Sequence, residues 1–150
     1  MIGLLQRVRH GRVEVDGDVV GGIGPGLVVL VGVERGDGPP QGERLLQRLL
    51  DYRVFEDGDG RMNRSLRDTG GGLLLVPQFT LAADTRKGNR PSFTPAAAPE
   101  EGRRLFEALL ARAREAWPRV AAGRFGAHME VSLCNDGPVT FWLRVPPPGS

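Results

Sequence analysis

The feature that most constrains the fold is an uninterrupted apolar run, Leu27-Val28-Val29-Leu30-Val31, enclosed by Gly26 and Gly32. A strand with one face in water alternates apolar and polar residues, so a run that is apolar throughout predicts a strand buried on both faces. Leu73-Leu74-Leu75-Val76 is a second run of this kind. Both runs are far shorter than the roughly 20 apolar residues of a membrane-spanning helix. We therefore expect a core built around two buried strands.

The first half of the chain surrounds the Leu27 run with short elements. Residues 2–33 combine β-rich segments with Gly and Asp turns, which favours an antiparallel meander with the Leu27 run as its buried central strand. Leucines at helical spacing predict a helix over roughly residues 41–52. Asp57-Gly58-Asp59-Gly60 predicts a turn, and it lacks the later ligands of a calcium-binding EF-hand loop.

The second half predicts one helix followed by two strands. Pro99 suits the first turn of a helix, apolar residues repeat after it at helical spacing, and Pro118 helps to end it. Residues 129–133 and 139–145 predict strands that are joined by a turn. The closing Pro-rich segment, residues 146–150, predicts a loose polyproline tail.

The composition is that of one globular domain. With 150 residues, 40% of them hydrophobic and 25% charged, the chain is large enough for a single core and has neither a disordered nor a membrane character. We expect one α+β domain over residues 1–145, in which antiparallel-rich strands form a barrel-like sheet pair with two packed helices. The first residues lack the basic segment of a signal peptide, so the cytosol is the expected compartment.

Metal and cysteine chemistry has few residues to use. Cys134 is the single cysteine, which excludes an internal disulfide, and His10 and His128 are the only histidines. We therefore expect no metal centre and no cofactor. Of the 20 basic residues, 19 are arginines. The arginine side chain binds phosphate oxygens well, so an RNA partner explains this excess, and a general bias toward arginine explains it equally.

Two segments place polar groups where apolar strands end. Residues 77–81, Pro-Gln-Phe-Thr-Leu, bring an amide, an aromatic ring and a hydroxyl to the end of the Leu73 run. Residues 135–140, Asn-Asp-Gly-Pro-Val-Thr, put a turn between the two C-terminal strands. The chain has no P-loop, no Gly-x-Ser-x-Gly elbow and no His-Glu-x-x-His zinc motif. An enzyme built on it would use backbone donors and hydroxyls, which suffices for a bond that is already activated.

These two segments resemble the paired signature motifs of the D-aminoacyl-tRNA deacylases, or D-tyrosyl-tRNA deacylases: Ser-Gln-Phe-Thr and Asn-x-Gly-Pro-Val-Thr. The similarity extends to Leu5-Gln6-Arg7-Val8, Gly60-Arg61-Met62-Asn63 and Arg90-Pro91-Ser92-Phe93, and covers nearly the whole chain. The resemblance implies a homodimer with active sites at the subunit interface. Its activity would be hydrolysis of the ester between tRNA and a D-amino acid, or glycine mischarged on alanine tRNA.

The resemblance also implies which residues catalyse the reaction. Gln78, Phe79 and Thr80 would form the catalytic group: backbone amides around them hold the ester, and the 2′-hydroxyl of the terminal adenosine assists. Thr80 is a candidate nucleophile, although no residue is visibly placed to deprotonate it. Gly137-Pro138 would form a cis peptide that enters the active site of the partner subunit and leaves an L-side chain no room.

Further residues are candidates for binding. Asn135, Met129 and Phe125 are expected to contact the substrate, and the last two are also compatible with the core. The loop cations Arg86, Lys87 and Arg90 either contact tRNA phosphates near the acceptor end or form a solvated loop face. Arg7 either pairs with a carboxylate or braces the Gly-Pro segment.

One position departs from the family pattern. Pro77 stands where the family has serine, so a hydroxyl and a backbone N–H donor are missing. We therefore expect slower hydrolysis than in relatives. One alternative is a nucleic-acid-binding module that kept the fold without hydrolytic activity. A second is an unrelated metal-dependent hydrolase, which the scarcity of His and Cys disfavours.

Overall fold

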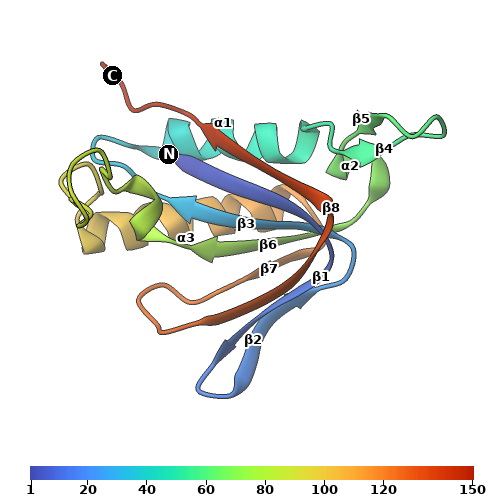
Figure 1. Cartoon of the computed structure of the whole chain (residues 1–150), viewed down its shortest axis with the longest axis horizontal. Coiled ribbons are helices and arrows are strands. Elements are labelled where there is room, and N and C mark those ends of the chain that lie inside the picture. Colours follow the sequence, from blue (N-terminus) through green and yellow to red (C-terminus); the bar gives the residue numbers. More distant parts are fainter.

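A computed structural model describes residues 1–150 and contains one curled, mixed sheet with helices packed on one face (Figure 1). The sheet order is β2-β1-β3-β6-β7, and β8 also pairs with β1. This confirms the predicted α+β domain with a barrel-like sheet. The six strands are β1 (Ile2–Val15), β2 (Asp18–Ile23), β3 (Gly26–Gly32), β6 (Gly72–Pro77), β7 (Val120–Ala122) and β8 (Glu130–Arg144). A separate hairpin consists of β4 (Phe55–Glu56) and β5 (Met62–Arg64).

β1 is the centre of the antiparallel part of the sheet. Its first half pairs with β3 and its second half with β2, so β2 and β3 follow one another along the same edge. β8 pairs with the opposite edge of β1. The predicted meander is therefore wrong in its strand order. β3 lies beside β1 because β1, with 14 residues, is long enough to hold both neighbours on one edge.

The two apolar runs lie side by side and are covered on both faces. β3 and β6 pair in parallel along their whole length. Leu27 and Val29 pack with the helices in the main core, whereas Val28 and Leu74 belong to a second cluster inside the curled sheet. Alternate residues of one strand therefore enter two different apolar layers. This confirms the predicted buried central strand and explains why the run contains no polar residue.

The curl of the sheet brings its two ends together. A Cβ atom placed on Gly21 of β2 would lie 2.4 Å from the carbonyl oxygen of Ala122 in β7. Only glycine permits this approach, because any side chain at position 21 would separate the two strands. The sheet is therefore nearly closed, as Figure 1 shows for β1, β2, β7 and β8.

The helices are α1 (Pro39–Asp51), α2 (Leu66–Thr69) and α3 (Pro99–Ala116), with a 3-10 turn η1 (Phe79–Ala82). The prediction of two packed helices missed α2, which is four residues long and too short to show periodicity. Its Ser65 cap accepts a hydrogen bond from the amide of Asp68, whose carboxylate accepts one from the amide of Ser65. No helix has the length and apolarity needed to cross a membrane.

β8 is continuous from Glu130 to Arg144, where two strands and a joining turn were predicted. Its partner is β1 on both sides of residues 135–138, with irregular register opposite Val8. The chain does not reverse there, because the extra residues are absorbed as a bulge that bends the strand. The turn prediction is therefore wrong. The Gly137–Pro138 peptide bond within the bulge is cis.

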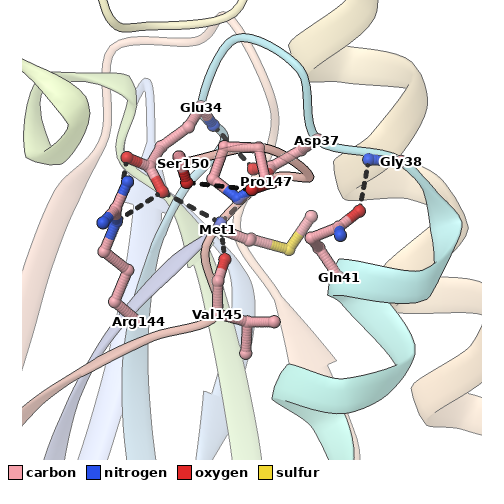
Figure 2. A network of polar contacts seen from close by, with 9 residues as sticks. All are labelled: Met1, Glu34, Asp37, Gly38, Gln41, Arg144, Val145, Pro147 and Ser150. Carbon is pink, nitrogen blue, oxygen red and sulfur yellow. Dashed lines mark hydrogen bonds and ion pairs between the residues drawn. The ribbon is translucent and has the colours of Figure 1, made fainter.

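A buried polar network joins the start of β1 to the end of β8 (Figure 2). The α-amino group of Met1 donates to the carboxylates of Glu34, at 3.1 Å, and Asp37, at 2.9 Å. Arg144 donates to Glu34 at 3.0 Å. Burial raises the pKa of Glu34, but hydrogen bonds from Arg144 and Met1 outweigh it and leave the pKa below its usual value. For Asp37 burial outweighs the bond from Met1, so its pKa is raised.

The Pro-rich tail contacts the domain through Pro147. Pro147 is buried, and a Cβ atom on Gly36 would lie 3.3 Å from its Cβ. The backbone N–H and the hydroxyl of Ser150 both donate to the carbonyl oxygen of Pro147. Pro147 therefore contacts the domain and a turn follows it, while Pro148, Gly149 and Ser150 are exposed.

Candidate active site

An apolar hollow of about 430 Å³ opens where β3 and β6 end. Its wall comes from the ends of these strands, the first residue of η1, the start of α3 and residues 125–131. Its size and apolar wall are typical of sites for small molecules. We call it the apolar hollow.

Gln78 and Phe79 lie on the rim of this hollow, and Thr80 follows them in η1. The backbone N–H of Gln78 donates to the carbonyl oxygen of Val31 at 2.8 Å, which fixes the chain as it leaves β6. η1 begins at the next residue, and the first N–H groups of a helical turn have no partner within it. The backbone donors of Phe79 and Thr80 are therefore available to a ligand.

These three residues separate the apolar hollow from a second one. Gln78 and Phe79 line the apolar hollow, whereas Thr80 lines a neighbouring hollow of about 400 Å³ with few apolar residues. We call the second one the polar hollow after its residue types, although carbon atoms make up most of its exposed wall. The Gln78 side-chain amide donates to the Thr80 hydroxyl, so a single short contact links the two sides. No carboxylate or histidine is hydrogen-bonded to Thr80.

Pro77 closes the inner end of the apolar hollow. It is the last residue of β6, it is buried, and it pairs with Val31 of β3. A Cβ atom on Gly123 would lie 3.3 Å from its Cδ, so the proline ring packs against the segment after β7. Pro77 therefore forms part of the wall, but it has no backbone N–H to donate to a ligand.

Phe125 and Met129 lie in the opposite wall of the apolar hollow. The Phe125 ring packs against Phe106, with 6.4 Å between centroids, and the Arg103 guanidinium lies 5.1 Å from the centroid of the Phe125 ring. The Met129 sulfur accepts a hydrogen bond from the backbone N–H of Arg124 at 3.3 Å. Both side chains are thus held in place around the hollow.

The second motif lies away from both hollows. Asn135 pairs with Val8, which pairs with Gly26 at the start of β3, whereas Gln78 is bonded to Val31 near its end. These two β3 positions are five residues apart (31 − 26), or roughly 16 Å of strand. Gly137 and Pro138 are exposed, and neither lines the apolar or the polar hollow. The structure therefore does not bring the two motifs together within one chain.

Side chains hold the second motif in one shape. Asn135 donates to the Thr140 hydroxyl at 2.8 Å and accepts from the backbone N–H of Val139 at 3.0 Å. The buried Arg7 donates from Nε to the carbonyl oxygen of Asp136 at 2.9 Å and from Nη1 to that of Val54 at 2.8 Å. Of the two roles considered for Arg7, bracing of the Gly-Pro segment is the one with good geometry, since the Asp136 carboxylate is 3.8 Å away.

The cation-bearing loop after η1 is closed by its own groups. Asp84 and Ser92 exchange two backbone hydrogen bonds of 2.8 and 2.9 Å. Asp84 also accepts from the side chain and the backbone N–H of Arg86, which lowers the pKa of its carboxyl to about 2. Lys87 and Arg90 make no ion pair. Of the three loop cations, Arg86 therefore helps to form the loop, and the other two present free charge.

Sequence reasoning missed much of the wall of the apolar hollow. The missed residues are mostly small or apolar and include Val33, Ala97, Gly102, Phe106 and His128. The sequence signal of Phe106 is helical spacing, which does not tell a pocket wall from a core contact. His128 is one of two histidines and precedes the candidate Met129, so it is the one missed residue that the sequence could have suggested. No group of three or more His, Cys, Asp or Glu side chains is placed to hold a metal ion.

Comparison with known sequences identifies close relatives. A family described as D-Tyr-tRNA(Tyr) deacylase matches residues 4–144. A D-aminoacyl-tRNA deacylase of Nitrosococcus oceani is 67% identical over 147 residues, which cover 98% of this chain and 95% of that protein. One from Paracidovorax citrulli is 65% identical over 150 residues, which cover 100% of this chain and 97% of that protein.

Solved structures share the fold. A structure named c-Myc DNA Unwinding Element Binding Protein is similar with a TM-score of 0.92 and 36% identity, covering 97% of this chain and 99% of that one. A probable eukaryotic D-amino acid tRNA deacylase is similar with a TM-score of 0.78 and 21% identity, covering 95% of this chain and 97% of that one. The second likeness bears on the fold alone.

Proposed function

This chain belongs to the D-Tyr-tRNA deacylase family, and we propose that it hydrolyses the ester between the 3′ end of tRNA and a D-amino acid, or glycine mischarged on alanine tRNA. The observation that carries the proposal is the rim formed by Gln78, Phe79 and Thr80 beside the apolar hollow. A hollow of this size suits the terminal adenosine, and free backbone donors at its rim suit the ester carbonyl.

The reaction needs little from side chains. An aminoacyl ester is activated, so the enzyme has to position water and stabilise the oxyanion, which the N–H groups of Phe79 and Thr80 would do. Water forms a bond to the carbonyl carbon, and the bond from that carbon to the ribose oxygen breaks. One water proton passes to the ribose oxygen, assisted by the neighbouring 2′-hydroxyl, and the carboxyl product loses its proton to solvent.

Thr80 acts in this proposal by positioning and not as the nucleophile. A threonine hydroxyl needs a general base to become a nucleophile. The hydrogen bond from Gln78 comes from an amide, which does not accept a proton at neutral pH. The Gln78–Thr80 contact therefore orders the rim, and water remains the attacking group.

Chiral selection would come from a second copy of the chain. We place the partner subunit's Gly137 and the partner subunit's Pro138 in the active site, where main-chain carbonyls bind the amino group and leave an L-side chain no space. The exposure of this segment and its distance from the apolar hollow support the arrangement. β8 also carries two large exposed aromatic residues, Phe141 and Trp142, which are 37% and 55% exposed. A partner subunit that packs on β8 would cover such side chains.

Substrate binding would extend from the adenosine to the tRNA backbone. Phe125 and Met129 would hold the adenine ring, since both line the apolar hollow. Asn135 would act indirectly, by fixing the second motif through Val139 and Thr140. The unpaired Lys87 and Arg90 would contact phosphates close to the 3′ end, in the cytosol where aminoacyl-tRNA is used.

The test is deacylation of D-tyrosyl-tRNA beside L-tyrosyl-tRNA by the purified protein, with and without a chelator. We expect rapid, chelator-resistant loss of the D-ester, with the L-ester decaying at its spontaneous rate. Equal rates for both esters would contradict chiral selection. Loss of activity in the chelator would contradict a mechanism without a metal.

A nucleic-acid-binding role without hydrolysis is the second candidate. Two observations favour it: Pro77 removes a donor from the site, and a similar structure bears the name of a DNA-binding protein. This candidate predicts that the protein binds tRNA while both esters decay at their spontaneous rates. Restoration of D-specific hydrolysis by Pro77→Ser would then locate the defect at this residue.

A further inference from the structure

The polar hollow lies directly beside the proposed substrate site and has no role so far. Its volume is about 400 Å³, close to that of the apolar hollow. Thr80 and Ala83 line it from η1 and the residue that follows it, and the loop after η1 provides the rest of the wall. The loop residues in this wall are Thr85, Gly88, Asn89, Arg90, Pro91 and Phe93.

An aromatic pair forms the partition between the two hollows. Phe79 lines the apolar hollow, Phe93 lines the polar one, and their ring centroids are 5.3 Å apart. Phe79 is 56% exposed and Phe93 43% exposed, so each ring presents a free face. Exposed aromatic rings of this kind are the usual platforms for the bases of single-stranded nucleic acid.

The polar hollow also contains a cation without a partner. Arg90 lines it and makes no ion pair, whereas Arg86 is bound to Asp84. The loop is closed at its base by the paired backbone bonds of Asp84 and Ser92, so Arg90 is carried by a fixed frame. The arginine can bind the phosphodiester of a nucleotide, and the neighbouring aromatic ring can stack on its base.

We infer that the polar hollow binds the nucleotide that precedes the terminal adenosine of tRNA, a cytidine. Phe93 stacks on its base, and Arg90 binds the phosphodiester that joins it to the adenosine. The inference rests on the proposed function, because it requires the terminal adenosine in the neighbouring apolar hollow. It assigns a separate subsite to the next nucleotide along the strand.

The experiment compares two small substrates: D-tyrosyl-adenosine, and D-tyrosyl-CpA, which adds the cytidine and its phosphodiester. We expect the wild-type protein to hydrolyse the CpA ester with a kcat/KM about tenfold higher, the factor that stacking of one base supplies. In Arg90→Ala and in Phe93→Leu this ratio should fall close to one. Arg114→Ala is the charge-matched control, since Arg114 is exposed and unpaired near the far end of α3, and it should retain the wild-type ratio.

Several outcomes separate this inference from the proposed function. Hydrolysis of neither ester by the wild-type protein would contradict the proposed function. Equal hydrolysis of both esters would leave the function intact and overturn the subsite. An equal fall of the ratio in Arg114→Ala would reduce the effect to overall charge and overturn it as well. A changed preference between D-tyrosyl-adenosine and glycyl-adenosine in Phe93→Leu, with the CpA ratio intact, would assign the polar hollow to the amino-acid side chain instead.

Discussion

The two motif segments, residues 77–80 and 135–138, differ in whether they line a hollow of their own chain. The first lies between two hollows, with its backbone fixed by β3 and its side chains in contact. The second is partly exposed and firmly braced, but lines neither hollow. A segment that is firmly braced, exposed and outside both hollows of its own chain is suited to contact another molecule. Under the proposed function, one copy supplies the pocket and the other supplies selection.

The strongest test of this difference uses two defective subunits. Phe79→Asp puts a charge at the apolar hollow, and Gly137→Val puts a side chain at a φ of +137°, where a Cβ would lie 2.8 Å from Val139. Each variant alone should lose about 100-fold of its D-ester hydrolysis, as displaced catalytic geometry typically does. In an equal mixture with exchanged subunits, half the dimers combine both variants and have one intact site, so activity should return to about a quarter of the wild-type value.

Mass spectrometry of the mixture provides the control, because it counts the mixed dimers. If mixed dimers form without recovery of hydrolysis, each active site uses both motifs of the same subunit. The proposed division of roles between two copies would then be wrong.

The next effect concerns the brace of the second motif. Arg7→Met removes the hydrogen bonds to the carbonyl oxygens of Asp136 and Val54. We expect D-ester hydrolysis to fall by about tenfold and the free energy of unfolding by about 2 kcal/mol, since bonds from a charged group are lost. The rate of D-tyrosyl-tRNA hydrolysis measures the first effect, and urea unfolding measures the change in the free energy of unfolding.

Arg9→Met is the matched control for this brace. Arg9 is exposed and lies 3.7 Å from the carboxylate of Asp136, a surface ion pair that contributes little. Both quantities should stay close to wild type. An equal loss of activity in the two variants would mean that charge near Asp136, and not the brace, sustains the reaction.

A smaller effect is expected at the first motif. Pro77→Ser restores a hydroxyl and a backbone N–H beside the apolar hollow. We expect kcat for D-tyrosyl-tRNA to rise by up to about tenfold, less than the roughly 100-fold effect of a donor aimed directly at the oxyanion. Pro77→Ala restores the N–H alone and separates the two contributions. A rate at or below wild type in both variants would show that the proline is no handicap.

The smallest effect concerns pH at the loop beside the first motif. Hydrogen bonds from Arg86 lower the pKa of Asp84 to about 2, so the stabilisation of the loop by the ionised carboxylate is fully present above the usual value of 3.8. It is lost as the pH falls through about 2. Between pH 5 and pH 8 this group should not affect hydrolysis. Carboxyl NMR of Asp84 would measure the midpoint, and a value near 3.8 would mean that Arg86 is free to bind RNA.

The core could be predicted from the two apolar runs, whereas the order of the strands in the sheet could not. Leu27 to Val31 is apolar because it enters two layers, and that pattern is visible without a structure. The meander was wrong because pairing depends on the length of β1, and turn residues do not encode it. The turn at residues 135–138 was wrong for a related reason: Gly and Pro mark a bulge as readily as a reversal.

The place of the first motif in the fold was predictable, whereas the residues that surround it were not. Gln78, Phe79 and Thr80 follow an apolar run, so their place at the end of a buried strand could be expected. The walls from α3 and residues 125–129 come from chain segments far apart in sequence, and only the tertiary fold brings them together. The sequence also gives no reason to distinguish Arg86 from Arg90. Only Arg86 pairs with Asp84, and that contact depends on the shape of the loop.

The pairing of β1 with β8 has a consequence for how the protein is made. Ile2 of the first strand pairs with Arg144 of the last one, and the α-amino group of Met1 is bonded near the same corner. During translation β1 leaves the ribosome before β8 is made, and the edge of β1 that pairs with β8 stays open until then. An open strand edge pairs with any other strand that it meets. Chains that end before β8 should therefore aggregate, and only chains that contain β8 should accumulate as folded protein.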